Sequence, residues 1–468
     1  MKAFRTLFFI ASVLVVLGTV CFLFPKGGVG FGPFNVRFPE LARVLNPQRI
    51  LDIEAYLARQ DSIKAVLKDR QDSLDYFRRQ VDSSDTRFAF PNGDDSFFDD
   101  LFCQLEQAQL AGRTVRILHY GDSQIEMDRM TDRLRKYMQE RFGGGGPGLV
   151  PFAPLIPSLS YSVYGTGSLV RQSPYGDTLV QRANGNYGPM VQDYRVDGVA
   201  TSTLTAGTHK RCDSRLRQFS RFKMLFNNLS DTLSARFDVR GGGYGDTRVC
   251  AEQGVRAMDW MLDSATTSVS ISVSGHADIY GIMVDDGPGV AVDNIPMRGC
   301  SGHQFTQINQ DQLTAAYAQM DVGLIILQFG GNSVPYINGP ASVATYCAGM
   351  GKQIDRLRQC CPNAKILFVG PSDMSTRRDG ELKTYPCIPQ LVEALQDTVN
   401  AHGAAFWSIY RAMGGYNSMV AWVEEGLSGP DYIHFSQRGA DIMGDRLAAA
   451  FDDVYQIYIM RKNVQNVR

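Results

Sequence analysis

Two short motifs with residue types suited to catalysis stand far apart in this chain. Gly121-Asp122-Ser123 directly follows an apolar, strand-like run at 114–120, and Asp431 and His434 stand three residues apart near the C-terminus. A serine hydroxyl becomes a strong nucleophile when an imidazole removes its proton, and a nearby carboxylate can hold that imidazole in place. The two motifs together indicate an enzyme that transfers acyl groups.

The segments around both motifs predict a catalytic domain of alternating strands and helices. The strand at 114–120 leads into the serine turn, and an amphipathic helix is expected at 125–142. Apolar runs at 322–329 and 364–369 are typical of buried parallel strands. Helical patterns follow both runs, and a last amphipathic helix is expected from 437 to 455. The outer parts of the chain therefore predict a three-layer α/β/α domain with a parallel sheet.

The middle of the chain has a different pattern. Short segments of alternating polarity, such as 158–164 and 268–273, are separated by Gly, Asn and Asp turns. This pattern favours an antiparallel β-sandwich. We expect the sandwich, at 151–285, to be inserted into an α/β domain made of residues 95–150 and 286–460.

The N-terminus carries a candidate membrane anchor. Residues 7–24 contain no charged side chain, and Lys2 and Arg5 precede them. A stretch of this length can span a bilayer, with its positively charged flank in the cytoplasm. A cleaved signal peptide is the alternative, although Phe22-Leu23-Phe24-Pro25 is a poor cleavage site. Either case predicts a cell-envelope protein whose catalytic domain lies in the periplasm or extracytoplasmic space.

The remaining segments are expected to connect or extend these parts. Residues 1–30 form the anchor and a glycine-rich spacer, 31–94 a helical stalk and linker, and 461–468 a C-terminal tail. The charged helical pattern at about 47–82 is compatible with a stalk or dimerising coil, and equally with a solvated helix on the catalytic body.

Composition and motif spacing argue against several classes of function. The formal net charge is −1 and no basic stripe is present, so nucleic-acid binding is not expected. The nine cysteines show neither C-x-x-C spacing nor a Cys/His cluster, so no metal site is expected. The glycine run at 143–148 lacks the Gly-Lys-Ser/Thr ending of a phosphate loop. We therefore expect no cofactor.

Four short blocks follow one another in order, each beside a suitable element: Ser123 after a strand, Gly302 in a turn, Asn332 after the apolar run, and Asp431 with His434 before the last helix. This arrangement resembles the SGNH (GDSL-type) hydrolase family. The resemblance implies that Ser123 is the nucleophile, His434 its base and Asp431 the residue that orients His434. It implies an oxyanion hole made of the backbone N–H groups of Ser123 and Gly302 and the side-chain amide of Asn332.

The sequence departs from the family pattern at several places. Gln124 follows the serine where Leu is common, and Ser333 replaces the Asp that often follows the third block. A long segment, the expected sandwich, separates the first block from Gly302, and Gly299 could align in place of Gly302. This layout is similar to SGNH enzymes of bacterial envelopes that carry an inserted carbohydrate-binding-like sandwich.

Each candidate residue also has a structural alternative. Ser123 could cap a helix, His434 could be structural, and Asn332 could end a turn. Other residues could contribute to function or merely to packing. They are His119 at the strand end, His303 beside the glycine turn, Glu126 and Asp128 as acids in the first turn of a helix, and Trp260, Trp407 and Trp422, which could stack on sugars or fill the core.

The resemblance implies a membrane-tethered serine esterase that acts on acylated, above all O-acetylated, envelope polysaccharide or peptidoglycan. Two alternatives remain open. An O-acetyltransferase would use the same residues and require an acyl donor, such as a membrane partner. A glycan-binding protein with an inactive catalytic fold would retain neither the Ser123 nor the His434 function.

Overall fold

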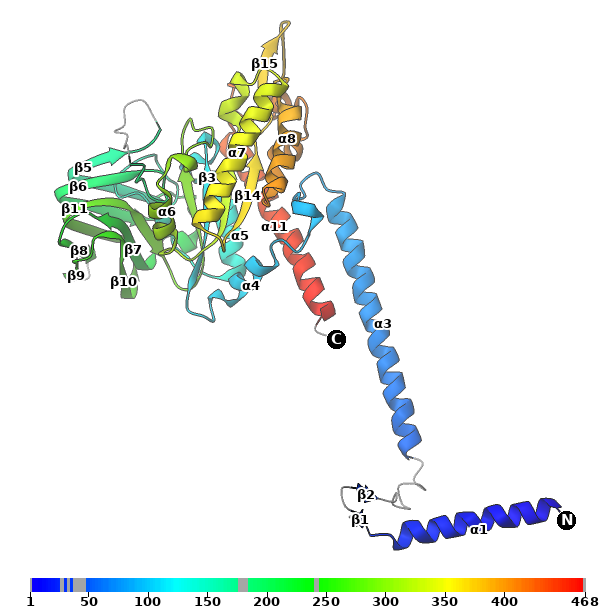
Figure 1. Ribbon diagram of the computed structural model, residues 1–468. Coiled ribbons are helices and arrows are strands. Elements are labelled where there is room, and N and C mark those ends of the chain that lie inside the picture. The colour runs from blue at the N-terminus through cyan, green and yellow to red at the C-terminus, as the bar shows by residue number, and fades with distance from the viewer. Residues whose placement is uncertain are drawn as a thin grey trace. The chain divides into compact units, whose positions relative to one another are not determined.

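The computed structural model describes residues 2–25, 29–31, 34–36, 48–175, 184–239 and 244–465. Parts of the expected spacer, linker and tail, at 26–28, 32–33, 37–47 and 466–468, lie outside the described residues. So do 176–183 and 240–243 within the expected insertion. The chain forms two compact units, Met1–Tyr76 with Met460–Arg468, and Phe77–Ile459 (Figure 1).

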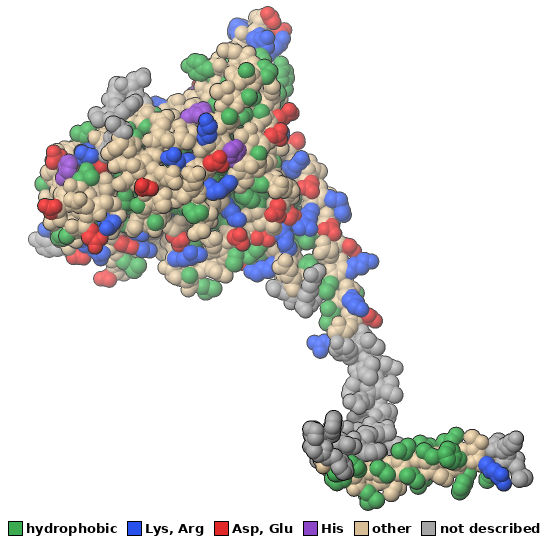
Figure 2. Space-filling model, viewed as in Figure 1, with side chains coloured by type: hydrophobic (Ala, Val, Ile, Leu, Met, Phe, Trp, Pro, Cys, Tyr) green, Lys and Arg blue, Asp and Glu red, His purple; other side chains and the backbone are tan. Residues whose placement is uncertain are grey.

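The first unit contains the apolar N-terminal helix and most of a long charged helix. Helix α1 (Lys2–Leu23) includes a 20-residue segment, Phe4–Leu23, with a mean hydropathy of 2.6, long and apolar enough to cross a membrane. Its hydrophobic side chains are exposed along its length (Figure 2). Strands β1 (Val29–Phe31) and β2 (Phe34–Val36) pair antiparallel, and α3 (Gln48–Asp82) covers the predicted charged helix.

The second unit contains the predicted parallel sheet. Its five strands pair in the order β12-β3-β13-β14-β17, and every neighbouring pair is parallel. They span Gly289–Pro296 (β12), Thr114–Gly121 (β3), Val322–Gln328 (β13), Lys365–Gly370 (β14) and Ala405–Ser408 (β17).

Helices cover both faces of this sheet, which gives the predicted three layers. On β13, Leu324 and Ile326 pack in one hydrophobic cluster, whereas Ile325 and Leu327 pack in another. Successive side chains of a strand point to opposite faces, so a continuous apolar run fills two cores. One face packs on α4 (Asp99–Ala108), α5 (Thr131–Phe142) and α11 (Gln437–Gln465), and the other on α6 (Gln310–Tyr317), α7 (Pro340–Cys360) and α8 (Ile388–Ala401).

An antiparallel sheet of eight strands occupies the middle of the chain, as the alternating pattern predicted. The long strand β11 pairs with β6 and β8 through its first half, and with β7 and β4 through its second half. The two halves enclose one hydrophobic core, which includes Phe222, Phe226 and Trp260. The strands are β4 (Gly148–Val150), β5 (Tyr161–Gln172), β6 (Asp193–Ala206), β7 (Phe219–Asn228), β8 (Leu233–Val239), β9 (Tyr244–Cys250), β10 (Gly254–Thr266) and β11 (Ser268–Asp285).

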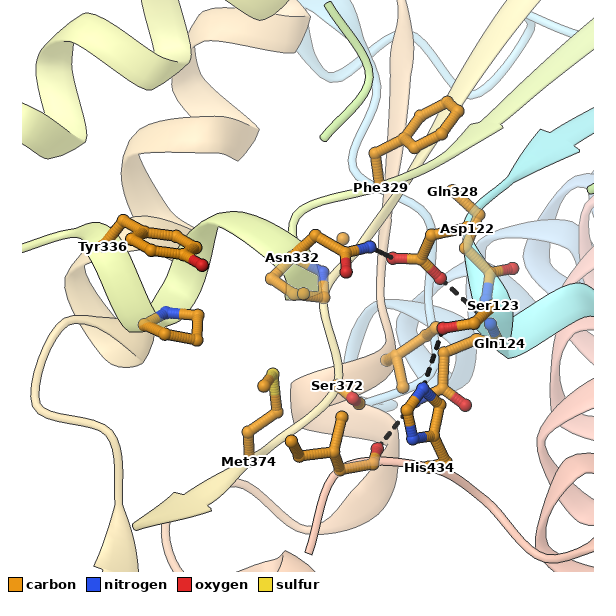
Figure 3. Close-up of a pocket in the computed structure, with 16 residues that line it drawn as sticks. Asp122, Ser123, Gln124, Gln328, Phe329, Asn332, Tyr336, Ser372, Met374 and His434 are labelled. Carbon is orange, nitrogen blue, oxygen red and sulfur yellow. Dashed lines mark hydrogen bonds between the residues drawn. The ribbon is translucent and has the colours of Figure 1, made fainter. Parts of the chain in front are cut away.

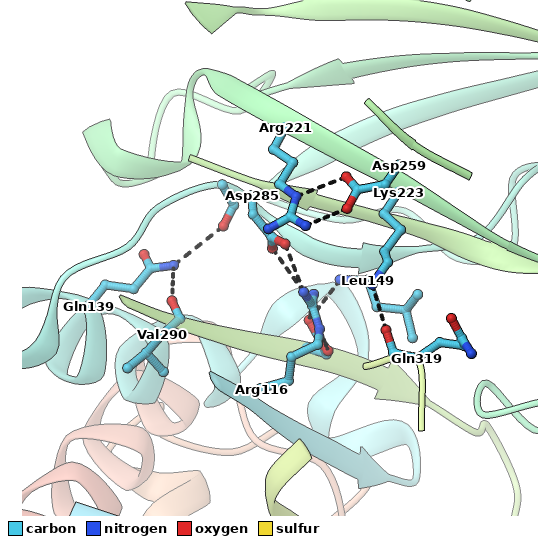
Figure 4. A network of polar contacts seen from close by, with 11 residues as sticks. Arg116, Gln139, Leu149, Arg221, Lys223, Asp259, Asp285, Val290 and Gln319 are labelled. Atoms are coloured by element: carbon cyan, nitrogen blue, oxygen red, sulfur yellow. Dashed lines mark hydrogen bonds and ion pairs between the residues drawn. The ribbon is translucent and has the colours of Figure 1, made fainter. Parts of the chain in front are cut away.

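A buried arginine joins the two sheets. Arg116 on β3 donates from Nε and Nη2 to Asp293 on β12, at 2.8 and 2.7 Å, and from Nη1 to Asp285 at the end of β11, at 2.8 and 3.1 Å (Figure 4). Burial disfavours its charge, but the two carboxylates outweigh this effect and raise the pKa of Arg116. The ion pairs therefore fix the antiparallel sheet against the parallel one.

Candidate active site

The candidate site lies at the carboxyl end of the parallel sheet, where the order of strands reverses. Strand β3 comes first in the sheet's chain order, and the next two strands, β12 and β13, lie on opposite sides of it. Loops that leave adjacent strands in opposite directions open a crevice at this point. Ser123 follows β3, and Asn332 follows β13.

Ser123 begins a tight turn rather than a regular helix. Residues Ser123–Asp128 form a 3₁₀ turn in which Met127 has a φ of 59°, and α5 begins only at Thr131. The predicted helix start at 125 is therefore wrong. The guanidinium of Arg129 donates to the carbonyl oxygens of Ser123, at 2.6 Å, and Glu126, at 3.0 Å. The Glu126 carbonyl also accepts from the backbone N–H of Arg129 at 3.2 Å, so the guanidinium adds to the backbone bonds of the turn.

Ser123, His434 and Asp431 form a continuous chain of hydrogen bonds. Ser123 Oγ lies 2.8 Å from His434 Nε2 (Figure 3). On the other side of the ring, His434 Nδ1 lies 2.8 Å from Asp431 Oδ2. The expected proximity of the serine and the imidazole is therefore observed. With a proton on Nδ1 donated to Asp431, Nε2 is free to accept the serine proton.

Asp431 is held as an ionised carboxylate. Its Oδ1 accepts hydrogen bonds from the backbone N–H groups of Ile433 and His434, both at 3.0 Å. Partial burial opposes ionisation, but these bonds and the one from the His434 ring outweigh it and lower the pKa of Asp431. A carboxylate fixed at both oxygens can orient the imidazole and stabilise its protonated form.

Gln124 and Arg129 connect the serine turn to the histidine loop. Gln124 Nε2 donates to the carbonyl of Ile433 at 2.7 Å, and Gln124 Oε1 accepts from the N–H of Phe435 at 3.2 Å. Arg129 Nη1 donates to the carbonyl of Phe435 at 3.1 Å. The two residues flanking His434 are therefore anchored to the serine turn. The only sequence signal for this role was the departure from Leu at position 124.

Asn332 reaches the serine turn through its side-chain amide. Its Nδ2 donates to the carbonyl of Cys300 at 3.1 Å and to Asp122 Oδ2 at 3.3 Å. Burial raises the pKa of Asp122 to about 6, although the N–H of Gln124 and the charge on His434 act to lower it. Both amide hydrogens of Asn332 thus have acceptors. To serve an oxyanion, Asn332 would exchange the longer contact, the one to Asp122.

Gly302 packs behind the wall of the site. Its φ is +95°, and a Cβ there would lie 2.9 Å from the ring of Phe329. The position therefore requires glycine on both conformational and steric grounds. Gly299 also has a positive φ, but a Cβ there would meet nothing within 4 Å. The oxyanion role of Gly302 stays a prediction.

A pocket opens beside Ser123 between the ends of β3, β13 and β14. One wall is apolar and includes Phe329, Met374 and Ile433, and Tyr336 at the pocket is 79% exposed. The antiparallel hairpin of β15 (Ser375–Arg378) and β16 (Glu381–Thr384) directly follows Met374. A partly apolar pocket next to a nucleophile suits a short acyl group. It is lined by Asp122, Ser123, Gln124, Gln328, Phe329, Gly331, Asn332, Pro335, Tyr336, Gly370, Pro371, Ser372, Met374, Ile409, Ile433 and His434.

Two other histidines are held within the fold. His119 is fully buried between Gln328 and Thr131, at 3.1 and 3.0 Å, and burial lowers its pKa to about 4 despite the Gln328 bond. It is a neutral packing residue at the strand end. His303 lies 3.0 Å from Ser301 Oγ and packs edge-on against the ring of Tyr346.

Glu126 and Asp128 do not act as first-turn helix acids, because the helix begins after them. Glu126 forms a bidentate ion pair with Arg298, and Asp128 forms a buried one with Arg135. The tryptophans occupy core positions with exposures of 2% (Trp260), 0% (Trp407) and 6% (Trp422).

Comparison with known proteins agrees with this geometry. Residues 263–442 match the model of the GDSL-like lipase/acylhydrolase family. No match was found among curated proteins.

Solved structures resemble the chain over different shares of its length. A structure described as a peptidoglycan O-acetylesterase in action has a TM-score of 0.65 and 21% identity, and the match covers 80% of this chain and 99% of that one. A family two carbohydrate esterase from Clostridium thermocellum, in complex with cellohexaose, has a TM-score of 0.28 and 9% identity, over 63% of this chain and 100% of that one.

The family match includes Gly302, Asn332, Asp431 and His434 but not Ser123, and the first of these structures shares the fold over most of this chain. The matched part of the chain is therefore similar to the GDSL-like, or SGNH, hydrolases, and the family match and the shared fold together support an ester hydrolase.

Proposed function

We propose that this protein is a serine esterase that removes acyl groups, above all acetyl, from a cell-envelope polysaccharide or peptidoglycan. The observation that carries the proposal is the hydrogen-bond chain from Asp431 through His434 to Ser123, which ends at a pocket with a partly apolar wall. Residue types, order and distances are those required for acyl transfer through an acyl-enzyme.

In the proposed reaction Ser123 Oγ attacks the ester carbonyl while His434 Nε2 takes the serine proton. The carbonyl carbon becomes tetrahedral, and its oxygen takes the negative charge. When the intermediate collapses, the bond to the sugar oxygen breaks and His434 returns the proton to that oxygen. Water then attacks the acyl-enzyme with His434 as base, which releases the carboxylic acid and restores Ser123.

The oxyanion would be stabilised by the N–H groups of Ser123 and Gly302 and the amide of Asn332. These donors are neutral and preset, so they add no charge to the free site. Loss of one such donor lowers kcat by about 10²–10³-fold in other serine enzymes.

Two further observations support the proposed substrate and location. The solved structure described as a peptidoglycan O-acetylesterase, at 21% identity, shares the fold, and this description suggests an O-acetylated glycan as the substrate of this chain. The apolar helix α1 supports an envelope protein anchored in the membrane, with residues 95–150, 151–285 and 286–460 outside the cytoplasm. We retain the division into an α/β domain and an inserted β-domain as part of this proposal.

The test is hydrolysis of 4-nitrophenyl acetate and release of acetate from O-acetylated peptidoglycan, with wild-type protein and Ser123→Ala. We expect the substitution to lower kcat by about 10⁴-fold or more, because the acyl-enzyme cannot form. A fluorophosphonate should label the wild-type protein at the peptide containing Ser123. The control is Ser96→Ala, in a surface turn where Ser96 bonds to Asp94; its activity should equal wild type.

Three results would overturn this proposal. Equal turnover by wild type and Ser123→Ala would exclude the serine mechanism. Glycan binding without any ester turnover would favour a glycan-binding protein. Acetylated sugar as the main product when an oligosaccharide acceptor is added would favour an O-acetyltransferase, which would then need an acyl-donor partner.

A further inference from the structure

A second pocket lies beside the serine turn, on the side of β3 away from the catalytic pocket. Pro296, the last residue of β12, pairs with Gly121 in the sheet, and the N–H of Met297 donates to the carbonyl of Gly121 at 2.7 Å. Gly121 is two residues before Ser123. The chain that carries Arg298 therefore passes directly beside the nucleophile.

This second pocket, which we call the arginine pocket, is formed by both sheets. Its residues on the α/β side are Pro296 and Arg298. The other lining residues come from the antiparallel sheet and from the loop after β4. The lining is Leu155, Ile156, Pro157, Arg171, Tyr175, Pro296 and Arg298.

Two guanidinium groups are held in this pocket by polar partners. Arg298 forms a bidentate ion pair with Glu126, whose side chain is 6% exposed, yet Arg298 itself is 69% exposed. Arg171 donates from Nε to the side-chain carbonyl of Gln192 at 2.9 Å, and Gln192 is 1% exposed. Both cations are thus held by buried polar partners, and Arg298 keeps its outer edge exposed to solvent.

The two pockets differ in charge. The catalytic pocket is lined by no Lys or Arg among the described residues, whereas the arginine pocket is lined by two arginines and, among the described residues, by no Asp or Glu. An ester has two sides, the acyl group and the alcohol. With the carbonyl at Ser123, each side can enter a different pocket, and the smaller acyl group suits the partly apolar one.

We propose that the arginine pocket binds the sugar on the alcohol side of the ester and selects glycans with a carboxylate next to the acylated residue. This inference rests on the proposed esterase function and defines its substrate class. Guanidinium groups donate to a carboxylate in a planar, bidentate geometry, and the Tyr175 ring with Pro296 and Ile156 offers apolar surface for a sugar face.

The inserted sheet therefore takes part in substrate recognition. Arg171 lies on β5, Tyr175 follows it and Leu155 to Pro157 follow β4, so five of the seven lining residues come from this sheet and its connecting segments. The same three residues, 155–157, also line a neighbouring pocket that continues along β5. That pocket includes Pro151, Pro154, Tyr161 and Val163. The surface thus has room for a further sugar of the chain.

The test compares two acetylated sugars that differ only by one carboxylated ether group. 6-O-Acetyl-N-acetylmuramic acid carries a lactyl carboxylate, and 6-O-acetyl-N-acetylglucosamine does not. We expect wild-type kcat/KM to be at least about tenfold higher for the first sugar, because a charge-assisted hydrogen bond to a carboxylate has about this effect. Arg298→Gln and Arg171→Gln should each remove most of that preference.

The controls separate this inference from the proposed function. Hydrolysis of 4-nitrophenyl acetate, which has no sugar, should stay within about twofold of wild type in both variants, and Arg298→Lys should restore part of the preference. Arg256→Gln removes an exposed arginine of the same antiparallel sheet, paired with Glu252 outside both pockets, and should leave all three substrates unaffected.

The outcomes are distinct. Failure of wild type to hydrolyse the aryl ester would contradict the proposed function itself. If wild type hydrolyses the aryl ester but turns over both sugars equally or neither of them, the carboxylate-binding inference is wrong. It is also wrong if Arg171→Gln, which leaves the Glu126 ion pair intact, retains the full preference.

Discussion

Gln124 is the residue at which this chain differs most usefully from the common pattern of its family. A leucine there could pack, but it could not bond to the carbonyl of Ile433 and the N–H of Phe435. The amide holds the backbone on both sides of His434. The position of the imidazole relative to Ser123 therefore depends on a residue that does no chemistry itself.

Replacing this residue should impair turnover more than stability. In Gln124→Leu, we expect kcat for 4-nitrophenyl acetate to fall by roughly 10²-fold, because a displacement of the base by about 1 Å has this effect in other enzymes. Steady-state kinetics measures the change. Gln107→Leu, on the exposed face of α4, is the matched control and should behave as wild type. Unchanged kcat in Gln124→Leu would show that the histidine loop keeps its position unaided.

His119 should make the protein less stable in mild acid. The unfolded chain takes up a proton at this residue near pH 6.5, but the buried folded form does so only near pH 4. The contribution of the neutral ring to the free energy of unfolding is therefore fully present above pH 6.5 and is lost as the pH falls towards 4. The full loss amounts to about 3 kcal/mol.

Asp122 has the opposite effect on stability over a similar pH range, because burial raises its pKa in the folded protein to about 6. The effect of His119 must therefore be measured as a difference between two proteins. Urea unfolding at pH 7 and pH 4.5 should show a smaller loss of stability in His119→Gln than in wild type. Equal losses in the two proteins would contradict the assigned burial effect.

Among single residues, the sequence was sufficient to predict those whose chemistry can be recognised from residue type and order. Ser123, Asp431 and His434 have the types and order of an acyl-transfer site, so their proximity could be expected. Arg129 and Arg298 could not be singled out. Their importance depends on carbonyls and carboxylates that only the folded chain brings near them.

Among the elements, the strands were easier to predict than the turns between them. The runs at 322–329 and 364–369 are nearly continuously apolar, interrupted only by Gln328 and Lys365 near their ends, as expected of strands covered on both faces. The start of α5 was placed six residues early, at 125 instead of Thr131, because the amphipathic pattern continues through the 3₁₀ turn. The hairpin β15–β16 was not predicted, since its short strands are largely charged.

The contact between the two sheets should depend strongly on Arg116. Arg116→Met leaves Asp285 and Asp293, 9% and 0% exposed, without their cation. Removal of one partner from a buried ion pair typically costs about 3–5 kcal/mol, so we expect a loss of stability of this size. Urea denaturation measures it. The control is Arg221→Met, whose partner Asp259 is 33% exposed, with an expected loss of about 1 kcal/mol or less. Similar losses of stability in Arg116→Met and Arg221→Met would contradict a special role of Arg116 in joining the two sheets.

For the whole molecule, we expect the apolar helix α1 to hold the proposed esterase at a membrane. We expect the full chain to remain with the membrane after cell fractionation, and a chain without residues 2–24 to appear in the soluble fraction with its aryl-esterase activity intact. A span of this length and hydropathy is sufficient for insertion. Ser123→Ala should fractionate like wild type. A truncated chain that stays in the membrane fraction would point to another anchor.

The insertion also has a consequence for biosynthesis. Translation delivers β3 and the serine turn first, then the eight antiparallel strands, and only afterwards β12 and β13, the neighbours of β3 in the sheet. His434 arrives later still, just ahead of α11. A nascent chain released before residue 434 would thus lack both a finished core and the proposed base, since distant contacts form late. Under the proposed mechanism, activity can appear only after translation has passed His434, so a partly made chain would be inert.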